Sequence, residues 1–379
     1  MRVGFISTFP PIECGIATYT QYLTEALRKK YADVYIVSHK GGAGPQVFPC
    51  FDYEDGDLAD KAFSMMMRFT PDVVHIQHEF GLFGKNFGVS VIPLIMNFRL
   101  TGIPVVTTLH TVYREIPESH GIILHSILLN SNRVIVHEEY QLRTLQEGFG
   151  IDLTRKVRVV PHGARELEPV PEAKVRLGLP PDKKMILLIG YFRPSKNFEL
   201  IVDLFPDILE RLPGAILVIA GKTRGKEFIE YRNLLYKRIE SSSVRDHIYL
   251  IRGQLSQNIF DTIISSADVV VLPYKTTSQS GILAHCLAFG KPVVTSGTEG
   301  MKGIMERSGA GLVCMDDSDF VENIVKILSD PGLAQRLCEN AETYVKNRIS
   351  WNIVADKHLK IYSEIMDIPR LKFHVICID

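Results

Sequence analysis

Short apolar segments alternate with longer amphipathic segments along the whole of this sequence, and no other feature constrains the fold as much. The apolar segments are rich in Val, Ile and Leu and carry few polar side chains, which is typical of strands buried on both faces. The longer segments have the spacing of amphipathic helices. The pattern predicts an α/β fold in which helices cover both faces of parallel sheets. The predicted strands are residues 3–6, 34–37, 73–77, 105–109, 133–136, 157–160, 185–189, 215–220, 248–251, 269–272, 292–295 and 311–313.

The two halves of the sequence repeat one pattern, which predicts two βαβ-type domains in tandem. Residues 2–7 lead through a turn into a helix over 16–30, and residues 184–190 lead in the same way into a helix over 197–212. Segment 166–181, rich in Pro, Glu and Ala, is typical of a linker with one short helix. We therefore assign residues 1–165 to the first domain and 166–350 to the second. A last helix is expected over 352–366, and the tail over 371–379 is either an added edge strand or irregular.

Charge and hydropathy exclude several classes of protein. Lys plus Arg and Asp plus Glu each number 43, so no net field attracts nucleic acid or an anionic membrane. No segment approaches the ~20 apolar residues of a membrane-spanning helix, and the apolar run at the N-terminus is too short for a secretory signal. The six cysteines contain no CxxC pair, which argues against a disulfide scaffold or a zinc site. We expect a cytoplasmic protein that contacts a membrane at most peripherally.

In open parallel sheets ligands bind at the carboxyl ends of strands, so the loops after the predicted strands are the candidate sites. Gly15 follows the first strand and precedes a helix, where a backbone can approach an anion such as a diphosphate. An ordinary turn accounts for Gly15 equally well. Arg193 and Lys196 follow the first strand of the second half and suit a phosphate or diphosphate. The alternative for these two is a solvated charged turn.

A third loop leads into a helix whose first N–H groups can hold phosphate oxygens. Ser280 and Gly281 open this helix, and Ile282 and Leu283 complete its first turn. His285 lies on the next turn, near the mouth of the expected site. A satisfied structural histidine is the usual alternative role for such a residue.

Polar residues also end strands of the first half. His110 ends an apolar strand, where an imidazole can bond a sugar hydroxyl or act as an acid or base. His78 and Glu79 end another strand of the same sheet, and each of the three can equally be a polar packing residue. Asp55 and Asp57 have the DxD form of a metal site, but no strand precedes them. We expect a solvated loop there and no metal site.

Taken together, these segments resemble the GT-B glycosyltransferases, and more narrowly the retaining enzymes of glycosyltransferase family 4, over nearly the whole chain. The strongest likeness is the run Ser-Ala-Asp-Val-Val-Val-Leu-Pro at 266–273, followed by the helix and strand over 281–294. Pro161-His162-Gly163 is similar to a family motif at the end of the first domain. Ser350-Trp351 is similar to the motif before the last helix.

The resemblance implies two facing Rossmann-like domains with a cleft between them. It places a nucleotide-sugar donor on the second domain and the acceptor on the first, with helix 352–366 packing back on the first domain. Gly15 matches the family's glycine loop near the donor diphosphate, and Lys196 matches its diphosphate lysine. His110 matches the histidine that contacts the transferred sugar. The backbone amides at the diphosphate fall on Gly281, Ile282 and Leu283.

The chain departs from the family at two places. The family's paired glutamates fall on Thr277 and His285, so Gln279 is the substitute expected to contact the sugar, while His285 bonds a ribose hydroxyl. The family's diphosphate arginine falls on Tyr191, and Arg193 stands two places later. Arg193 is therefore expected to reach the same phosphate oxygens from another angle.

The function implied is a retaining glycosyltransferase that moves a hexose to a hydroxyl of a saccharide or glycolipid. GDP-mannose is the first expectation for the donor, and UDP-glucose or another nucleotide-hexose is the alternative. Helix N-termini, Lys196 and Arg193 are expected to neutralise the leaving diphosphate without a metal ion or other cofactor. His110 orients the sugar, with Glu79 or His78 as acceptor contacts. Two rival hypotheses are a nucleotide-sugar-binding protein without activity, motivated by the missing glutamates, and a nucleotide-sugar 2-epimerase.

Overall fold

The computed structural model describes residues 1–223, 225, 227–253 and 255–366, so the tail over 371–379 lies outside the described residues. The chain divides into two compact units. Unit 1 comprises Met1–Gly163 together with the chain from Trp351 onward, and unit 2 comprises Ala164–Ser350. Each unit has its own parallel sheet, as the alternation of apolar and amphipathic segments predicted.

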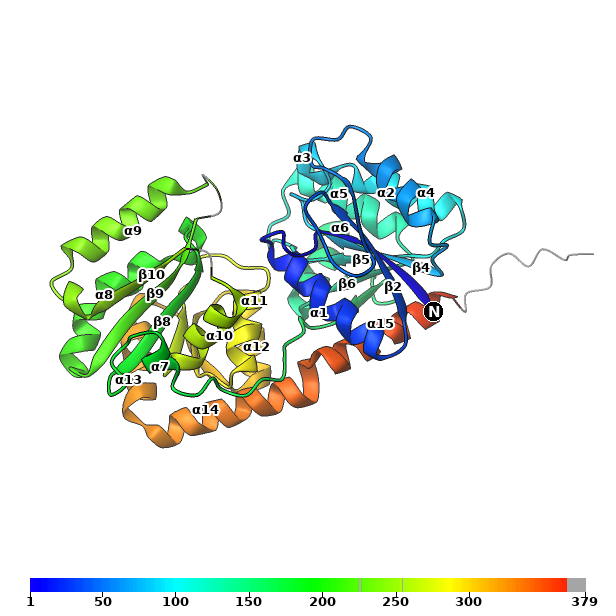
Figure 1. Ribbon diagram of the computed structural model, residues 1–379. Coiled ribbons are helices and arrows are strands. Elements are labelled where there is room, and N and C mark those ends of the chain that lie inside the picture. The colour runs from blue at the N-terminus through cyan, green and yellow to red at the C-terminus, as the bar shows by residue number, and fades with distance from the viewer. Residues whose placement is uncertain (224, 226, 254, 367–379) are drawn as a thin grey trace, which may run out of the picture. The chain divides into compact units, whose positions relative to one another are not determined.

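Unit 1 contains a seven-stranded sheet in the order β3-β2-β1-β4-β5-β6-β7 (Figure 1). Parallel pairing of Val3 with both Val34 and Val73 sets the register around the central strand. Every strand predicted for this half is present. The edge strand β3 was missed because its Pro49 has no N–H and breaks the strand pattern, which an edge position tolerates. The strands are β1 (Arg2–Ser7), β2 (Asp33–His39), β3 (Val47–Phe51), β4 (Val73–His78), β5 (Val105–Leu109), β6 (Arg133–Val136) and β7 (Val157–Val159).

Helices cover both faces of this sheet. Apolar side chains of α2, α4, α5 and α6 form one core with one face, and α1 and α15 pack against each other over the other face. The predicted helix over 16–30 is confirmed, shifted by one residue. The helices are α1 (Gly15–Lys29), α2 (Leu58–Met67), α3 (Lys85–Gly88), α4 (Val91–Leu100), α5 (Glu118–Asn130), α6 (Glu139–Phe149) and α15 (Trp351–Met366).

Unit 2 contains a six-stranded parallel sheet in the order β10-β9-β8-β11-β12-β13 around one continuous core. All its predicted strands are present, and the short helix predicted in the linker is α7. The strands are β8 (Lys184–Tyr191), β9 (Ala215–Lys222), β10 (Ile248–Arg252), β11 (Val269–Leu272), β12 (Val293–Ser296) and β13 (Gly311–Cys314). The helices are α7 (Ala173–Arg176), η1 (Pro194–Lys196), α8 (Phe198–Arg211), α9 (Ile229–Ser241), η2 (Arg245–His247), α10 (Gln257–Ser266), α11 (Gly281–Ala288), α12 (Glu299–Ser308), α13 (Asp317–Ser329), α14 (Pro331–Tyr344) and η3 (Val345–Ile349).

The strand order of each sheet reverses beside its first strand, between β1 and β4 in unit 1 and between β8 and β11 in unit 2. Loops that leave the carboxyl ends of such neighbouring strands diverge and open a crevice in which ligands bind. Gly15 follows β1, and Glu79 follows β4. Lys196 follows β8, and Gly281 follows β11. Chain topology alone therefore brings these four residues to the point where the strand order of their own sheet reverses.

The chain passes between the units at two places, and both carry motifs singled out in the sequence. A Cβ atom on Gly163 would lie 2.4 Å from the indole ring of Trp351, so only glycine allows this ring to pack there. One residue further, the Ala164 N–H donates to the Ile349 carbonyl (2.8 Å). The Pro-His-Gly and Ser-Trp motifs therefore pack against each other in the fold.

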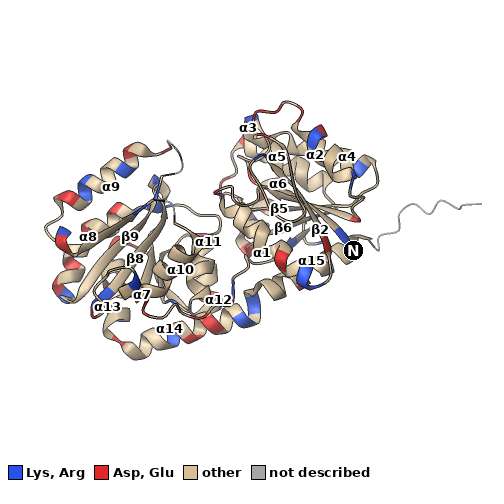
Figure 2. Cartoon of the chain, in the orientation of Figure 1, with Lys and Arg blue, Asp and Glu red and all other residues tan. Residues whose placement is uncertain are grey.

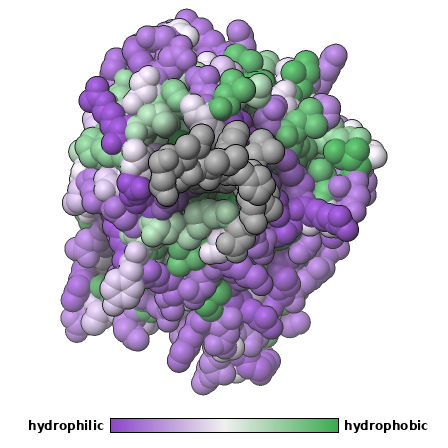
Figure 3. Space-filling view, turned by 90° about the vertical axis from the view of Figure 1, so that its right-hand side faces the viewer, coloured by the Kyte–Doolittle hydropathy of each residue, from purple (hydrophilic) through white to green (hydrophobic). Residues whose placement is uncertain are grey.

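Charged residues of both signs are interspersed on the helices of each unit (Figure 2). On the face seen in Figure 3 hydrophilic side chains predominate and apolar ones are scattered. Among the described residues, no helix combines the length and the apolar character needed to cross a bilayer.

Candidate functional site

Three loops at the carboxyl ends of the unit 2 strands are joined into one structure. The Lys275 N–H, after β11, donates to the Ser195 carbonyl after β8 (3.0 Å). The Ser296 hydroxyl at the end of β12 donates to the Tyr274 carbonyl (2.6 Å). A Cβ atom on Gly300 would lie 2.7 Å from the Ser278 carbonyl oxygen, so glycine is needed where α12 begins against this loop. The loops are therefore held in place before any ligand arrives.

Lys196 is a half-buried cation at the centre of these loops. Its Nζ lies 3.4 Å from the centroid of the buried Tyr274 ring, a close cation–π contact. No carboxylate of the described residues lies within salt-bridge distance of it. Desolvation, and secondly the charge of Arg193, lower the pKa of Lys196 well below its usual value. By contrast, the exposed Lys275 pairs with Glu199 (3.1 Å). An anion bound at Lys196 would offset the cost of desolvating this charge.

Arg193 is exposed but acts electrostatically on the same buried groups. Its charge lowers the pKa of Lys196 and partly opposes the rise that burial causes in the pKa of Tyr274. Tyr191, the position where the family has its arginine, ends β8. The structure thus brings Arg193 and Lys196 together around Tyr274, a residue that the sequence analysis did not single out.

Helix α11 begins at this same site, where no described group accepts from the N–H groups of Gly281 and Ile282. The Ser280 hydroxyl caps the helix by accepting from the Leu283 N–H (3.2 Å), and the Ser280 carbonyl accepts from the Ala284 N–H (3.3 Å). The Leu283 N–H is therefore already satisfied, and Gly281 and Ile282 are left to bind an anion.

Gln279, immediately before this helix, has a buried side-chain oxygen. No described group donates a hydrogen bond to Oε1 of Gln279. The Thr277 hydroxyl instead donates to the Gln279 main-chain carbonyl (2.9 Å). A ligand with a hydroxyl group would satisfy the buried side-chain oxygen.

His285 belongs to a separate polar cluster. Arg165 binds Asp261 with two hydrogen bonds (2.8 and 2.6 Å), and its Nη2 lies 3.4 Å from His285 Nδ1. The ring edge of Phe260 packs on His285 (5.1 Å between centroids). Arg165 stands where the linker begins, so a sequence pattern gave no reason to pair it with His285.

His110 of unit 1 lies in a chain of buried polar side chains. Its Nε2 is 2.8 Å from Gln77 Oε1, and its Nδ1 is 3.3 Å from His137 Nε2. The ring is only 2% exposed. Burial, and then the neighbouring His137, lower its pKa well below the usual range. His137 is buried in the same way, which lowers its pKa to about 3. Both rings are therefore neutral at physiological pH.

The series of hydrogen-bonded side chains around His110 continues to the last helix, α15. Gln77 Nε2 lies 3.2 Å from His75 Nε2, and His75 Nδ1 lies 2.6 Å from the Tyr362 hydroxyl on α15. The Thr108 hydroxyl also contacts His75 Nε2 (2.7 Å). Residues 287 positions apart are thus joined through buried hydrogen bonds.

The positions of the ring protons decide whether each of these buried side chains can form its hydrogen bonds. His137 Nδ1 faces the Val160 carbonyl (3.0 Å) and must donate, so its Nε2 accepts from His110 Nδ1 when both rings are neutral. His110 Nε2 then lacks a proton, yet it faces the oxygen of Gln77. Turning the Gln77 amide by half a rotation supplies the missing donor. In either orientation both nitrogens of His110 contact protein groups, so a sugar contact requires one of them to be released.

The remaining predicted residues of unit 1 differ in how accessible they are to a ligand. His78 is fully buried between the rings of Phe80 and Phe83, and neither of its ring nitrogens has a hydrogen-bond partner among the described residues. Burial lowers its pKa to about 3, so it is a poor proton acceptor. Glu79 is half-buried and accepts from the Thr111 hydroxyl (2.6 Å). Gly15 begins α1 with open space where a side chain would stand.

The two carboxylates of the DxD segment form ion pairs with a lysine. Lys61 Nζ lies 3.1 Å from an oxygen of Asp55 and 2.9 Å from one of Asp57. These ion pairs lower the pKa of Asp55. The carboxylates are therefore engaged in a local surface cluster, and no group of described His, Cys, Asp and Glu residues has the arrangement of a metal site.

Both units match models of known protein families. The family model "Glycosyltransferase Family 4" matches residues 14–165, and the model "Glycosyl transferases group 1" matches residues 170–344. An uncharacterized glycosyltransferase of Methanocaldococcus jannaschii, MJ1607, is 30% identical over 194 residues, which are 50% of this chain and 47% of the relative. The matched segment thus spans about half the length of that relative.

Longer matches are more distant. Alpha-monoglucosyldiacylglycerol synthase of Streptococcus pneumoniae is 23% identical over 91% of this chain and 84% of the relative. Among solved structures, sucrose-phosphate synthase of Thermosynechococcus elongatus has a TM-score of 0.77 at 18% identity, covering 96% of this chain and 99% of the other. Anabaena Alr3699/HepE in complex with UDP also has a TM-score of 0.77, at 12% identity, covering 96% and 100%. These structures share the fold.

Proposed function

We propose that this chain, which belongs to the glycosyltransferases of group 1 and family 4 and has the GT-B architecture of two Rossmann-like domains, transfers a hexose from a nucleotide sugar to a hydroxyl of a saccharide or glycolipid acceptor. The observation that carries the proposal is Lys196. A half-buried ammonium with no described carboxylate within salt-bridge distance, beside the N-terminus of α11, suits a diphosphate.

The chemistry follows from the charge of the leaving group. When the bond between the sugar and the diphosphate breaks, negative charge grows on the departing phosphate. Lys196, the N–H groups of Gly281 and Ile282, and Arg193 would stabilise that charge. We propose that these groups act in place of a divalent cation and that the sugar keeps its anomeric configuration.

We propose two candidates for the nucleotide-sugar donor. GDP-mannose is the first, on the family resemblance. UDP-glucose is the alternative, and it gains support from a relative whose name is alpha-monoglucosyldiacylglycerol synthase and from a similar fold solved with UDP. On the acceptor side, the half-buried carboxylate of Glu79 is a better proposed contact than the enclosed ring of His78.

A thermal-shift panel tests the donor site first, because a ligand that binds only the folded chain raises the melting temperature. GDP, UDP, ADP and their hexose conjugates would be compared with and without EDTA. We expect one nucleotide to stabilise the protein equally in both conditions. Release of nucleoside diphosphate that requires an added saccharide or glycolipid then tests transfer. Stabilisation by none of the nucleotides would contradict the proposal.

A second candidate is a nucleotide-sugar-binding protein without transferase activity. It is favoured by His285, which replaces a family glutamate and is held by the Arg165–Asp261 pair. The two functions differ in one measurement. Tight nucleotide-sugar binding without acceptor-dependent turnover over a broad acceptor panel would favour the second, and any such turnover would exclude it.

A further inference from the structure

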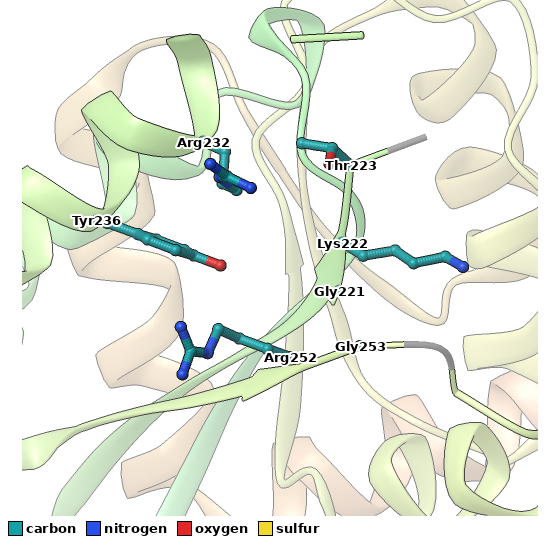
Figure 4. Close-up of a pocket in the computed structure, with 7 residues that line it drawn as sticks. All are labelled: Gly221, Lys222, Thr223, Arg232, Tyr236, Arg252 and Gly253. Atoms are coloured by element: carbon teal, nitrogen blue, oxygen red, sulfur yellow. The ribbon is translucent and has the colours of Figure 1, made fainter. Parts of the chain in front are cut away.

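Unit 2 contains a second group of cations outside the loops assigned to the donor. They line a cavity of about 430 Å3 at the carboxyl ends of β9 and β10, beside α9 (Figure 4). Neither Arg193 nor Lys196 is among the described residues that line this cavity, and none of those residues is acidic. The lining residues are Gly221, Lys222, Thr223, Arg232, Tyr236, Arg252 and Gly253.

Two guanidinium groups flank Tyr236 in this cavity. The central carbons of the Arg232 and Arg252 guanidinium groups each lie 5.9 Å from the centroid of the Tyr236 ring. Figure 4 shows the Tyr236 hydroxyl pointing into the space between them, whereas Lys222 points away. Since Arg232 and Tyr236 belong to α9 and Arg252 ends β10, the fold brings these three polar groups together.

The charges of these two arginines are not compensated within the described chain. Arg232 donates to the neutral side chain of Asn233 (Nη2 to Oδ1, 2.9 Å), and Arg252 pairs with no described carboxylate. Arg238, two turns further along α9, instead forms an ion pair with Asp203 (2.8 Å). Two planar donors left without acids suit a ligand group that carries several anionic oxygens.

Two of the lining residues are glycines at positions that disfavour a side chain. At Gly221 a Cβ atom would lie 1.9 Å from the Gly190 carbonyl oxygen of the neighbouring strand. Gly253 has a φ of +116°, which side chains rarely allow. The volume of the cavity lies within the range of ~300–1,000 Å3 found for small-molecule sites, so it exceeds the need of a phosphate ion alone.

We propose that Arg232, Tyr236 and Arg252 bind the phosphate monoester of a small molecule such as a sugar phosphate, in addition to the nucleotide sugar. A phosphate monoester carries about two negative charges at neutral pH and several acceptor oxygens. Both guanidinium groups and the Tyr236 hydroxyl can donate to it, and the remaining volume holds the sugar. This inference goes beyond the proposed function, because none of its residues belongs to the donor loops.

Isothermal titration calorimetry of the full chain with glucose 6-phosphate tests the proposal, with inorganic phosphate and glucose as separate arms. We expect glucose 6-phosphate to bind and glucose not to bind. Arg232→Met and Arg252→Met should each weaken binding about tenfold, as expected for a lost charge-assisted contact. Arg238→Met, on the same helix but paired with an acid, is the matched control and should change it less than about twofold.

The outcomes distinguish a sugar phosphate from free phosphate, and this cavity from the nucleotide site. Equal affinity for inorganic phosphate would assign the site to free phosphate. Binding of neither compound, or unchanged binding in a folded Arg232→Met/Arg252→Met protein, would overturn the proposal. Loss of glucose 6-phosphate binding when nucleoside diphosphate is added would also overturn it, because the cavity would then belong to the nucleotide site. Lys196→Met keeps the two proposals distinguishable, since it should weaken nucleotide binding and leave glucose 6-phosphate binding intact.

Discussion

The carboxyl ends of the two sheets differ in charge although the sheets have the same architecture. In unit 1 the strand ends carry buried neutral imidazoles, such as the hydrogen-bonded pair His110 and His137. In unit 2 they carry cations such as the half-buried Lys196, which lies within salt-bridge distance of no described carboxylate. The same architecture therefore carries neutral, hydrogen-bonded side chains at the strand ends of one unit and positive charge at those of the other. From this difference we infer that topology sets the position of the proposed site, whereas the balance of charge sets the class of ligand that it suits.

The largest expected effect is acid destabilisation of unit 1. Burial lowers the pKa of His78 and His137 to about 3, and that of His162 and His358 to about 4. Below pH ~6.5 the unfolded chain takes up protons that the folded unit does not, so each ring lowers the free energy of unfolding by about 1.4 kcal/mol per pH unit. Their contribution is complete above pH ~6.5 and is lost progressively toward pH ~3–4.

Trp351 is the single tryptophan and belongs to unit 1, so urea unfolding followed by its fluorescence isolates this effect. We expect the unfolding midpoint to fall steeply from pH 7 to pH 5. A midpoint that stays constant over this range would mean that the histidines of unit 1 are not held neutral, and the comparison between the units would fail.

Gly281→Val tests the second half of the comparison. The added isopropyl group at the start of α11 would lie beside the N–H groups proposed to hold the diphosphate. We expect nucleoside diphosphate affinity to fall about 100-fold, as for two lost charge-assisted contacts, while circular dichroism stays unchanged. Unchanged affinity for GDP and UDP in the folded variant would remove this loop from the site.

His110→Ala should separate turnover from donor affinity. If His110 orients the sugar, turnover falls about 10- to 100-fold because positioning is lost, whereas the dissociation constant of the nucleoside diphosphate changes little. Because the ring is buried, His110→Gln provides a second variant that retains hydrogen-bonding capacity. Wild-type turnover in both variants would assign His110 a purely structural role in the chain from Gln77 to His137.

Arg193→Met should give the smallest effect. Its guanidinium is exposed, so solvent screens it, and we expect nucleotide affinity to fall about threefold. Titration at low and high salt would check this, since a screened contact weakens with salt. A loss larger than that of a Lys196 variant would show that the exposed arginine, rather than the half-buried lysine, holds the diphosphate.

The sequence predicted the architecture because buried parallel strands leave a local signal. Only β3 escaped, since Pro49 interrupts its pattern. The immediate surroundings of the site left no such signal. Nothing near Lys196 in the sequence indicates that its ammonium packs on Tyr274, and nothing near Arg165 indicates Asp261 or His285. These contacts join residues distant in sequence, so they depend on the complete fold rather than on spacing.

The central claim is that Lys196, half-buried and within salt-bridge distance of no described carboxylate, holds the nucleotide diphosphate. Burial lowers its pKa, and a bound anion would raise it again, so affinity should fall as pH rises between the two values and binding should take up a proton there. The most direct measurement is calorimetric titration of GDP and UDP into wild type, Lys196→Met and Lys275→Met, in buffers of different ionisation enthalpy. The account predicts that Lys196→Met loses about 10- to 100-fold in affinity together with the proton uptake, while Lys275→Met behaves as wild type. Undiminished binding to a folded Lys196→Met protein would contradict it.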